Sequence, residues 1–217
     1  MAVDAGADAL GLVFAPSPRQ VTMEEARTVR AAIPAGVELV GVFVEEPFET
    51  VRDAILGADL GGAQFHKDPD RLWSDEDMAA WEELRASRPG LRVVQAIRAR
   101  DAATLHAELA GRLVGASQVL LDAYVPGLAG GTGQTFDWSL VDTAKAYGRP
   151  IIMAGGLTPN NVAEAIRRAR PWGVDVSSGV EAEPGRKDHD AVRRFIAAAR
   201  AADADAAAES SETAPVW

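Results

Sequence analysis

Short apolar runs alternate with helix-period stretches along most of the chain. The apolar runs are continuous, without alternating polar residues, which is typical of parallel strands buried on both faces. The runs predicted as strands are Ala9–Phe14, Leu39–Val44, Gly62–Phe65, Val93–Ile97, Val119–Leu121, Ile151–Ala154 and Val174–Val176. The pattern therefore predicts a parallel sheet in which a helix follows each strand.

The stretches between these runs carry the signals of amphipathic helices. Thr22 with Glu25, and Ser74 with Asp77, form the pattern of a capping box at a helix start. The predicted helices run from Thr22 to just before Pro34 and over about Pro47–Leu56, Ser74–Ser87, Ala102–Leu109, Trp138–Tyr147, Asn161–Ala169 and Asp188–Ala202. Strict alternation of strands and helices predicts an α/β fold, either a (β/α)8 barrel or a doubly wound sheet.

The number of units bears on which α/β fold to expect. The pattern gives seven β/α units, preceded by Met1–Ala7, which resembles the end of a further helix. A closed barrel of this type needs eight units. We therefore expect a member of the TIM (β/α)8 barrel class whose first β/α unit is largely missing from this chain. Residues 1–200 are expected to form the barrel domain, and the Ala-, Ser- and Glu-rich residues 201–217 a disordered tail.

Composition narrows the classes of partner. The chain has 217 residues, which suits one barrel domain, and it carries a net charge of −10 with a pI of about 4.8. An acidic surface repels nucleic acids and anionic membranes, so neither is expected as a partner. The sequence has no cysteine, which excludes disulfides and thiolate metal sites. No apolar run approaches the roughly 20 residues of a membrane helix, and no signal-peptide pattern is present, so a cytoplasmic protein is expected.

Two glycine-containing loops follow the last two predicted strands. Gly155 and Gly156 follow one strand, and Ser177, Ser178 and Gly179 follow the other. Glycine allows the backbone to approach a ligand closely, and backbone N–H groups at a helix start bind anions. One such loop alone would indicate only a tight turn. The two in succession predict the phosphate site that recurs after strands seven and eight of these barrels.

Polar residues at other strand ends are candidates for chemistry. Asp122 directly follows an apolar strand, which places its carboxylate at the mouth of a barrel, and the glycine-rich segment Gly130–Trp138 behind it is suited to close over a substrate. Arg19 lies in a loop stiffened by two prolines and is suited to bind a carboxylate, although a solvated side chain is the more common outcome for a loop arginine taken alone. His66 ends the third strand, where a ligand contact and a structural role are about equally expected. The three histidines lie on separate elements, so no metal site is expected.

Together these segments resemble the phosphoribosylanthranilate isomerase family. The matching stretches are GADALGLVFAPSPRQV, VGVFV, QFH, LLDA, GGTGQTFDW, AGGLTPNNV and VDVSSGVEAEPGRKD, in this order from about Gly6 to Asp188. The resemblance implies an Amadori rearrangement of N-(5'-phosphoribosyl)anthranilate to its carboxyphenylamino-deoxyribulose phosphate isomer, in tryptophan biosynthesis. It implies no cofactor, and a small phosphosugar-anthranilate substrate as the partner of a monomer or homodimer.

The resemblance also implies roles for individual residues. Asp122 in LLDA matches the general acid that opens the ribose ring, and Arg19 in SPRQV matches the arginine that binds the anthranilate carboxylate. Gly155, Gly156, Ser177 and Ser178 match the phosphate loops. Asp175 in VDVSSG is placed to contact the sugar or its phosphate, and His66 in QFH matches a histidine that lines the site.

The chain departs from the family at three points. The general base of the family is a cysteine on the first strand, and this chain starts after that strand and has no cysteine. Lys67 replaces a glycine after the histidine, and Gln134 replaces a lysine in the glycine-rich segment. The first departure leaves two interpretations open. One is the isomerase encoded as a short form, and the other is a non-catalytic phosphosugar-binding remnant of that enzyme.

Overall fold

The structure, a computed structural model, describes residues 1–99, 101–111, 115–123 and 138–212. Its larger sheet has seven strands in the order of the sequence. They are β1 Ala9–Val13, β2 Glu38–Phe43, β3 Gly62–Phe65, β4 Arg92–Ala99, β5 Gln118–Ala123, β6 Ile151–Ala154 and β7 Gly173–Val174. The strand pairs β1–β2, β2–β3, β3–β4 and β6–β7 are all parallel, as the continuous apolar runs predict.

A helix follows each strand, so the predicted alternation is confirmed. The α-helices of the described chain are α1 Met23–Ala32, α2 Phe48–Gly57, α3 Asp75–Ser87, α4 Ala102–Gly111, α5 Ser139–Lys145, α6 Val162–Ala169 and α7 His189–Glu212. Both predicted capping boxes are present, with Thr22 and Glu25 closing the start of α1 and Ser74 and Asp77 that of α3. The fold is therefore α/β with a parallel sheet. The (β/α)8 barrel class, with its first β/α unit largely missing from this chain, stays a prediction.

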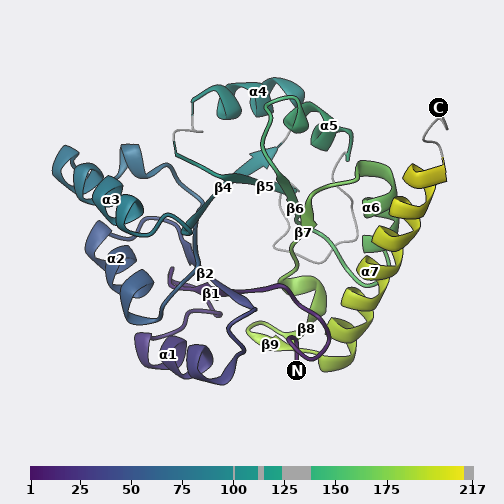
Figure 1. Ribbon diagram of the computed structural model, residues 1–217, viewed down its shortest axis with the longest axis horizontal. Helices are drawn as coiled ribbons and strands as arrows, with labels where there is room; N and C mark the ends of the chain where they lie inside the picture. Colours follow the sequence, from purple (N-terminus) through teal and green to yellow (C-terminus); the bar gives the residue numbers. More distant parts are fainter. Residues whose placement is uncertain (100, 112–114, 124–137, 213–217) are drawn as a thin grey trace. The chain divides into compact units, whose positions relative to one another are not determined.

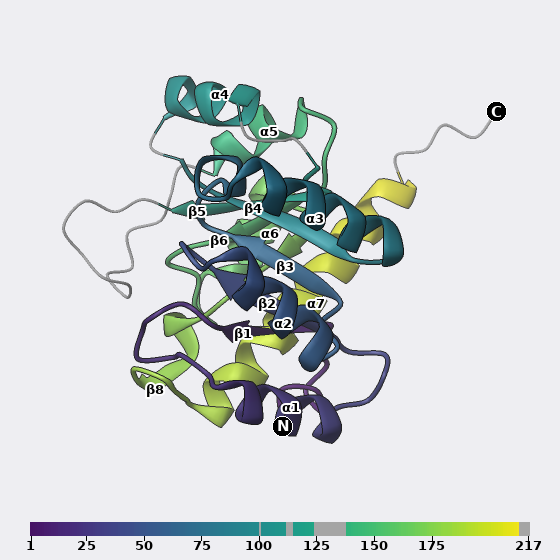
Figure 2. The same ribbon diagram turned by 90° about the vertical axis from the view of Figure 1, so that its left-hand side faces the viewer.

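The chain forms two compact units. The β1–β4 unit comprises Ala7–Ile97 and Glu108–Leu120, and the β6–β7 unit comprises Met1–Gly6, Arg98–Ala107 and Leu121–Trp217. In the β1–β4 unit, helices α1, α2 and α3 lie along one face of the strands (Figures 1 and 2). In the β6–β7 unit, α6 and α7 pack side by side (Figure 1). No helix in the described ranges is long and apolar enough to cross a membrane.

An aromatic cluster forms much of the core of the β1–β4 unit. Phe14, Phe43 and Phe65 stand at the carboxyl ends of β1, β2 and β3, and their rings stack with centroid distances of 5.3 and 5.8 Å. The ring of Phe65 also makes edge contacts with Trp73 and Trp81, 5.7 and 5.6 Å away. Side chains alternate across a strand. Because Phe65 packs toward the helix layer, the neighbouring His66 side chain points to the opposite face of β3.

The structure differs from the sequence prediction near the end of the chain. The last strand of the sheet ends at Val174, two residues before the predicted Val176, because the chain turns into a short 3-10 helix at Ser178–Val180. A hairpin of β8 Glu181–Glu183 and β9 Arg186–Lys187 follows, which the sequence analysis missed. The Pro-Gly pair between these strands was the sequence signal for this hairpin, since Gly185 has a φ of +84°.

The predicted disordered tail is also corrected in part. Helix α7 continues to Glu212, twelve residues beyond the predicted domain end at residue 200. The segment is rich in alanine, which has the highest helix propensity. Ala202 is almost fully buried, and the Arg170 guanidinium donates to the carbonyl of Ala206 at 3.1 Å. Packing and propensity thus extend the helix where the loss of apolar period indicated an end.

Two adjacent residues of α2 test how far core packing stabilises the β1–β4 unit. Ile55 is fully buried, whereas Leu56 is 52% exposed. We expect Ile55→Ala to lower the free energy of unfolding by about 2–5 kcal/mol, because a cavity remains in a close-packed core. Leu56→Ala in the same helix should change it by no more than about 0.5 kcal/mol. Urea unfolding of both variants measures the difference, and equal losses would contradict the packing described.

Candidate functional site

The loop after β6 has a backbone that requires glycine. Gly155 and Gly156 have φ values of +78° and +65°, in the left-handed region that other residues enter only with strain. The side-chain amide of Asn161 donates to the carbonyl of Gly156 at 3.0 Å and accepts from the N–H of Thr158 at 2.7 Å. Asn161 thereby fixes the loop at the start of α6. The sequence analysis placed this residue only as a helix start.

The loop after β7 packs directly on the loop after β6. The N–H of Asp175 continues the β6–β7 ladder by donating to the carbonyl of Met153 at 2.9 Å. Beyond it, a Cβ atom placed on Gly179 would lie 1.8 Å from the carbonyl oxygen of Leu157, so only glycine fits there. The structure therefore brings the two predicted phosphate loops together. Gly156–Leu157 and Ser178–Gly179 are neighbours, as one anion held by both loops requires.

The hairpin closes back onto the second loop. The Lys187 ammonium on β9 donates to the carbonyl of Ser177 at 2.9 Å and lies 2.9 Å from Glu181 Oε1 on β8. The next residue, Asp188, caps α7 by accepting from the N–H groups of Asp190 and Ala191. These two hydrogen bonds lower the pKa of Asp188, which keeps the cap ionised. Sequence reasoning did not identify Lys187, because its partners are set by a hairpin that was not predicted.

Two carboxylates interact in the same unit. Burial among protein atoms raises the pKa of Asp175, and the charge of Asp122 raises it further, while Lys187 and a hydrogen bond from the Val176 N–H lower it. The Asp175 side chain nevertheless remains accessible to solvent, so the protein atoms around it desolvate it only in part. The Asp175 carboxyl group, repelled by the charge of Asp122, therefore binds a proton more readily than an isolated carboxyl group does.

Arg19 follows β1 in a tightly closed loop of the β1–β4 unit. The N–H of Val21 donates to the carbonyl of Val13 at 2.8 Å, and the side chain of Gln20 donates to that of Phe14 at 2.9 Å. Ser17 Oγ accepts from the N–H of Arg19 at 3.1 Å. These bonds fix the backbone that carries the half-buried Arg19 side chain, as the two prolines of the loop predict.

His66 follows β3 in the same unit. The ring Nε2 of His66 lies 3.1 Å from Nε2 of Gln64, which stands two residues earlier on the same face of the strand. The backbone N–H of His66 donates to the carbonyl of Phe43 at 3.0 Å. Lys67, one of the departures from the family pattern, is exposed and forms an ion pair with Glu45. That substitution is thus accommodated at the surface.

The predicted site residues divide between the two units. Asp122, Asp175 and both phosphate loops belong to the β6–β7 unit, whereas Arg19 and His66 belong to the β1–β4 unit. The part of the glycine-rich segment before Trp138, with Gln134, lies outside the described residues. The structure thus brings together the groups predicted to meet the sugar and its phosphate.

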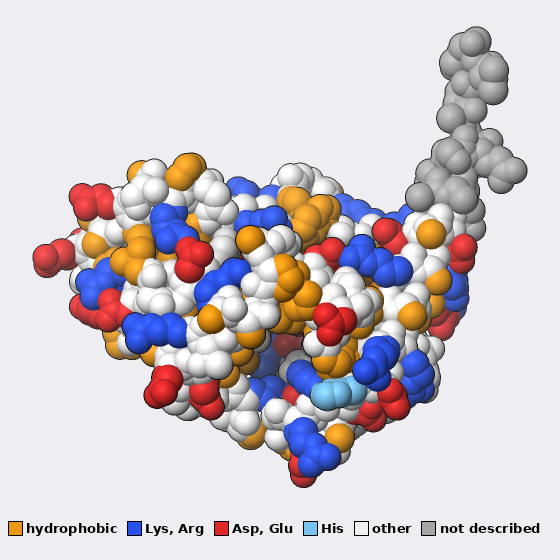
Figure 3. All heavy atoms as spheres, turned by 60° about the horizontal axis from the view of Figure 1, so that its bottom comes forward, with side chains coloured by type: hydrophobic (Ala, Val, Ile, Leu, Met, Phe, Trp, Pro, Cys, Tyr) orange, Lys and Arg blue, Asp and Glu red, His pale blue; other side chains and the backbone are white. Residues whose placement is uncertain are grey.

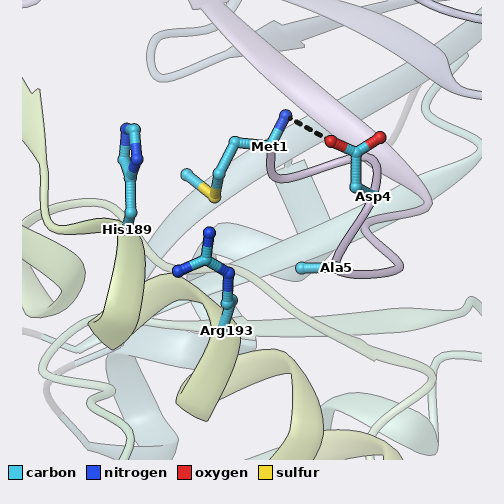
Figure 4. A pocket seen from close by; sticks show the side chains of 5 residues that line it. All are labelled: Met1, Asp4, Ala5, His189 and Arg193. Carbon is cyan, nitrogen blue, oxygen red and sulfur yellow. Dashed lines mark ion pairs between the residues drawn. The ribbon is translucent and has the colours of Figure 1, made fainter.

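A pocket of about 270 Å³ lies elsewhere in the β6–β7 unit (Figure 4). It is lined by Met1, Asp4, Ala5, His189 and Arg193. The terminal ammonium of Met1 pairs with Asp4 at 3.1 Å, and Arg193 pairs with Asp190 at 2.8 Å. The pocket shares no residue with the loops after β6 and β7. Active sites of β/α barrels are formed at the carboxyl ends of the strands, so we assign this pocket no part in the site.

Comparisons with known proteins point to one family over nearly the whole chain. The family described as N-(5'phosphoribosyl)anthranilate (PRA) isomerase matches residues 1–198. A relative from Roseiflexus castenholzii, named N-(5'-phosphoribosyl)anthranilate isomerase, is 46% identical over an alignment of 208 residues that covers 93% of this chain and 92% of the relative. The crystal structure of phosphoribosyl anthranilate isomerase from Thermotoga maritima has a TM-score of 0.78 and 38% identity, covering 92% of this chain and 91% of that one.

One similar solved structure contains a ligand. It is described as phosphoribosyl anthranilate isomerase in complex with reduced 1-(o-carboxyphenylamino)-1-deoxyribulose 5-phosphate. It has a TM-score of 0.73 and 34% sequence identity, and covers 92% of this chain and 91% of that chain.

The contact between the two loops can be tested at Gly179. We expect Gly179→Ala to abolish tight binding of inorganic phosphate or ribose 5-phosphate, because its Cβ would force the Leu157 carbonyl away and separate the loops. Gly90→Ala is the matched control, since nothing lies within 4 Å of a Cβ at Gly90. Isothermal titration measures the affinities. Unchanged binding by Gly179→Ala would show that the two loops do not act on one anion.

The electrostatics of Asp175 predict a dependence of stability on pH. A carboxyl group whose pKa is raised by folding destabilises the native state above that pKa, and the effect disappears as the pH falls toward the unfolded value. We therefore expect Asp175→Asn to raise the melting temperature at pH 7–8, with a gain that shrinks on acidification. Asp203→Asn, on an exposed part of α7, is the control. A melting temperature of Asp175→Asn equal to or below that of the wild type at pH 8 would reject the shift.

Proposed function

This chain belongs to the N-(5'-phosphoribosyl)anthranilate isomerase family, and we infer that it catalyses the isomerisation of N-(5'-phosphoribosyl)anthranilate to 1-(2-carboxyphenylamino)-1-deoxyribulose 5-phosphate. The reaction belongs to tryptophan biosynthesis. The single observation that carries this conclusion is the family match over residues 1–198, with 46% identity to a named relative. The apposed loops after β6 and β7 support it independently, because the substrate has a terminal phosphate.

The reaction needs one acid and one base. A proton on the ribose ring oxygen opens the ring and leaves an imine between C1 and the anthranilate nitrogen. Removal of the C2 proton then gives an enolamine, which becomes the ketone when C1 is protonated. Proton transfers of this kind contribute about 10²–10⁴-fold each when the group is well placed.

Asp122 is our candidate for the acid. It stands at the carboxyl end of β5, where active-site groups of β/α barrels are found. Asp175 is proposed to bind the sugar hydroxyls as an acceptor.

The ends of the substrate are assigned to the remaining residues. The N–H groups of the loops around Gly155–Gly156 and Ser177–Ser178 are proposed to bind the phosphate, and the guanidinium of Arg19 the anthranilate carboxylate. The sequence has no cysteine. His66 is therefore our candidate for the base among these 217 residues, since imidazole accepts protons near neutral pH. We also propose that the α/β fold is of the (β/α)8 barrel class.

Replacing the proposed acid tests the mechanism. We expect Asp122→Asn to lower kcat by about 10²–10⁴-fold, because the amide cannot protonate the ring oxygen. Binding of reduced 1-(o-carboxyphenylamino)-1-deoxyribulose 5-phosphate, an analogue of the product, should change little, since its binding needs no proton transfer. Chromatographic detection of the product and titration with the analogue measure the two effects.

Asp142→Asn, at an exposed carboxylate of α5 that pairs with Lys145, is the control for this experiment. Wild-type turnover by Asp122→Asn would exclude Asp122 as the acid. Absence of turnover from the wild-type chain itself would reject the proposed function.

A further inference from the structure

One lysine links the loop after β7 to the hairpin that follows it. Lys187 Nζ lies 2.9 Å from the carbonyl oxygen of Ser177 and 2.9 Å from Glu181 Oε1. The Lys187 side chain is 39% exposed, whereas that of Glu181 is only 4% exposed. A nearly buried carboxylate holds its partner strongly, because an unpaired charge there would be costly. The Lys187 ammonium is thus a fixed charge and not one carried by a freely moving side chain.

The bond to Ser177 sets the direction of a backbone amide. In a trans peptide the C=O of one residue and the N–H of the next point in opposite directions. Because the Ser177 carbonyl is turned toward Lys187, the N–H of Ser178 points away from the hairpin.

The loop after β6 is held in the same way. There the Gly156 carbonyl is turned toward the Asn161 side chain, so the N–H of Leu157 points away from α6. Each of the two apposed loops therefore has one carbonyl bound by a side chain, and the N–H that follows it points away from that side chain.

We propose that Lys187 is a positioning residue for the phosphate site, which holds the Ser177–Ser178 peptide in the orientation that binds the 5-phosphate of the substrate. This proposal rests on the proposed function only for the identity of the phosphate ester that is bound. Lys187 acts through the backbone of Ser177 and Ser178 and does not take part in the chemical steps.

The same charge acts on Asp175. The groups that act on that carboxyl are Asp122 from β5, Lys187 from β9 and the N–H of Val176, and only the last two favour its ionised form. Removal of the Lys187 charge therefore raises the pKa of Asp175. Replacement of Lys187 is thus expected to have two effects that replacement of a purely structural lysine would not have. Phosphate affinity falls, and the acid limb of the pH profile moves to higher pH.

Lys145 provides a control with the same kinds of partner, although its carboxylate partner Asp142 is exposed whereas Glu181 is nearly buried. It is also 39% exposed, and its Nζ also donates to a backbone carbonyl, that of Ala169 at 2.6 Å, and pairs with a carboxylate, that of Asp142 at 3.0 Å. Neither partner belongs to the proposed site. Lys145→Met therefore reproduces the loss of a lysine and its hydrogen bonds without touching the phosphate loops.

The experiment measures ribose 5-phosphate binding by titration, and kcat and KM from pH 5 to 9, for Lys187→Met, Lys187→Arg and Lys145→Met. We expect Lys187→Met to weaken ribose 5-phosphate binding and raise KM by about 10- to 100-fold, the size expected for a lost charged hydrogen bond. Its acid limb should move to higher pH. Lys187→Arg should keep ribose 5-phosphate affinity and KM within a few-fold of the wild type, because it retains a charged donor. Its acid limb should stay at the pH of the wild type.

The outcomes separate this proposal from the proposed function. If the wild type is active and Lys187→Met matches Lys145→Met in binding, KM and pH profile, Lys187 has no positioning role although the function stands. If the wild type shows no turnover but binds ribose 5-phosphate in a way that only Lys187→Met weakens, the function fails and the positioning role stands. If Lys187→Met does not fold, Lys187→Arg decides, since loss of binding in that folded variant would overturn the proposal. A wild type that does not bind ribose 5-phosphate overturns it as well.

Discussion

The close approach of Gly179 to the carbonyl of Leu157 is the constraint on which the candidate site depends. A side chain at this position would overlap the carbonyl oxygen, so glycine is required for the two loops to share one surface. The β6–β7 pairing brings the loops near each other, and the hydrogen bond from Asp175 to Met153 extends that pairing to the loop itself. The site is therefore formed by backbone atoms whose positions are fixed by packing, as binding of a phosphate by N–H groups requires.

The electrostatics of this region oppose the charge of the whole protein. The net charge is −10, and on the face in Figure 3 acidic and basic side chains are interspersed. Binding of an anionic substrate therefore depends on nearby hydrogen-bond donors. Salt screens the repulsion from acidic side chains that lie farther away on the surface. Within the β6–β7 unit, Lys187 supplies one fixed positive charge, while Asp122 and Asp175 supply two carboxylates whose repulsion favours a bound proton. The β6–β7 unit thus holds groups suited to a phosphate and groups suited to acid catalysis.

Most of the regular structure followed from local patterns. Continuous apolar runs placed the strands of the sheet, and the Thr22–Glu25 and Ser74–Asp77 patterns placed two helix starts, because these signals involve residues that are close in sequence. The exceptions lie after Val174. There the strand gives way to a 3-10 turn and a short hairpin, whose strands are too brief and polar to produce a period. Helix α7 also continues past its predicted end at Ala202 to Glu212, because the helix propensity of alanine adds no apolar period to the sequence.

The sequence by itself determined which residue types stand at the strand ends: the glycines and serines of the two loops, and Asp122 and Asp175. Strand ends are marked locally, and active sites of β/α barrels form at the carboxyl ends of the strands. Only the tertiary structure decided how these residues are held. Asn161 binds the Gly156 carbonyl, Lys187 binds that of Ser177, and the charges of Asp122 and Asp175 act on each other. Each of these interactions depends on the path of the backbone between its partners, which the packing of strands, helices and hairpin fixes and residue type does not.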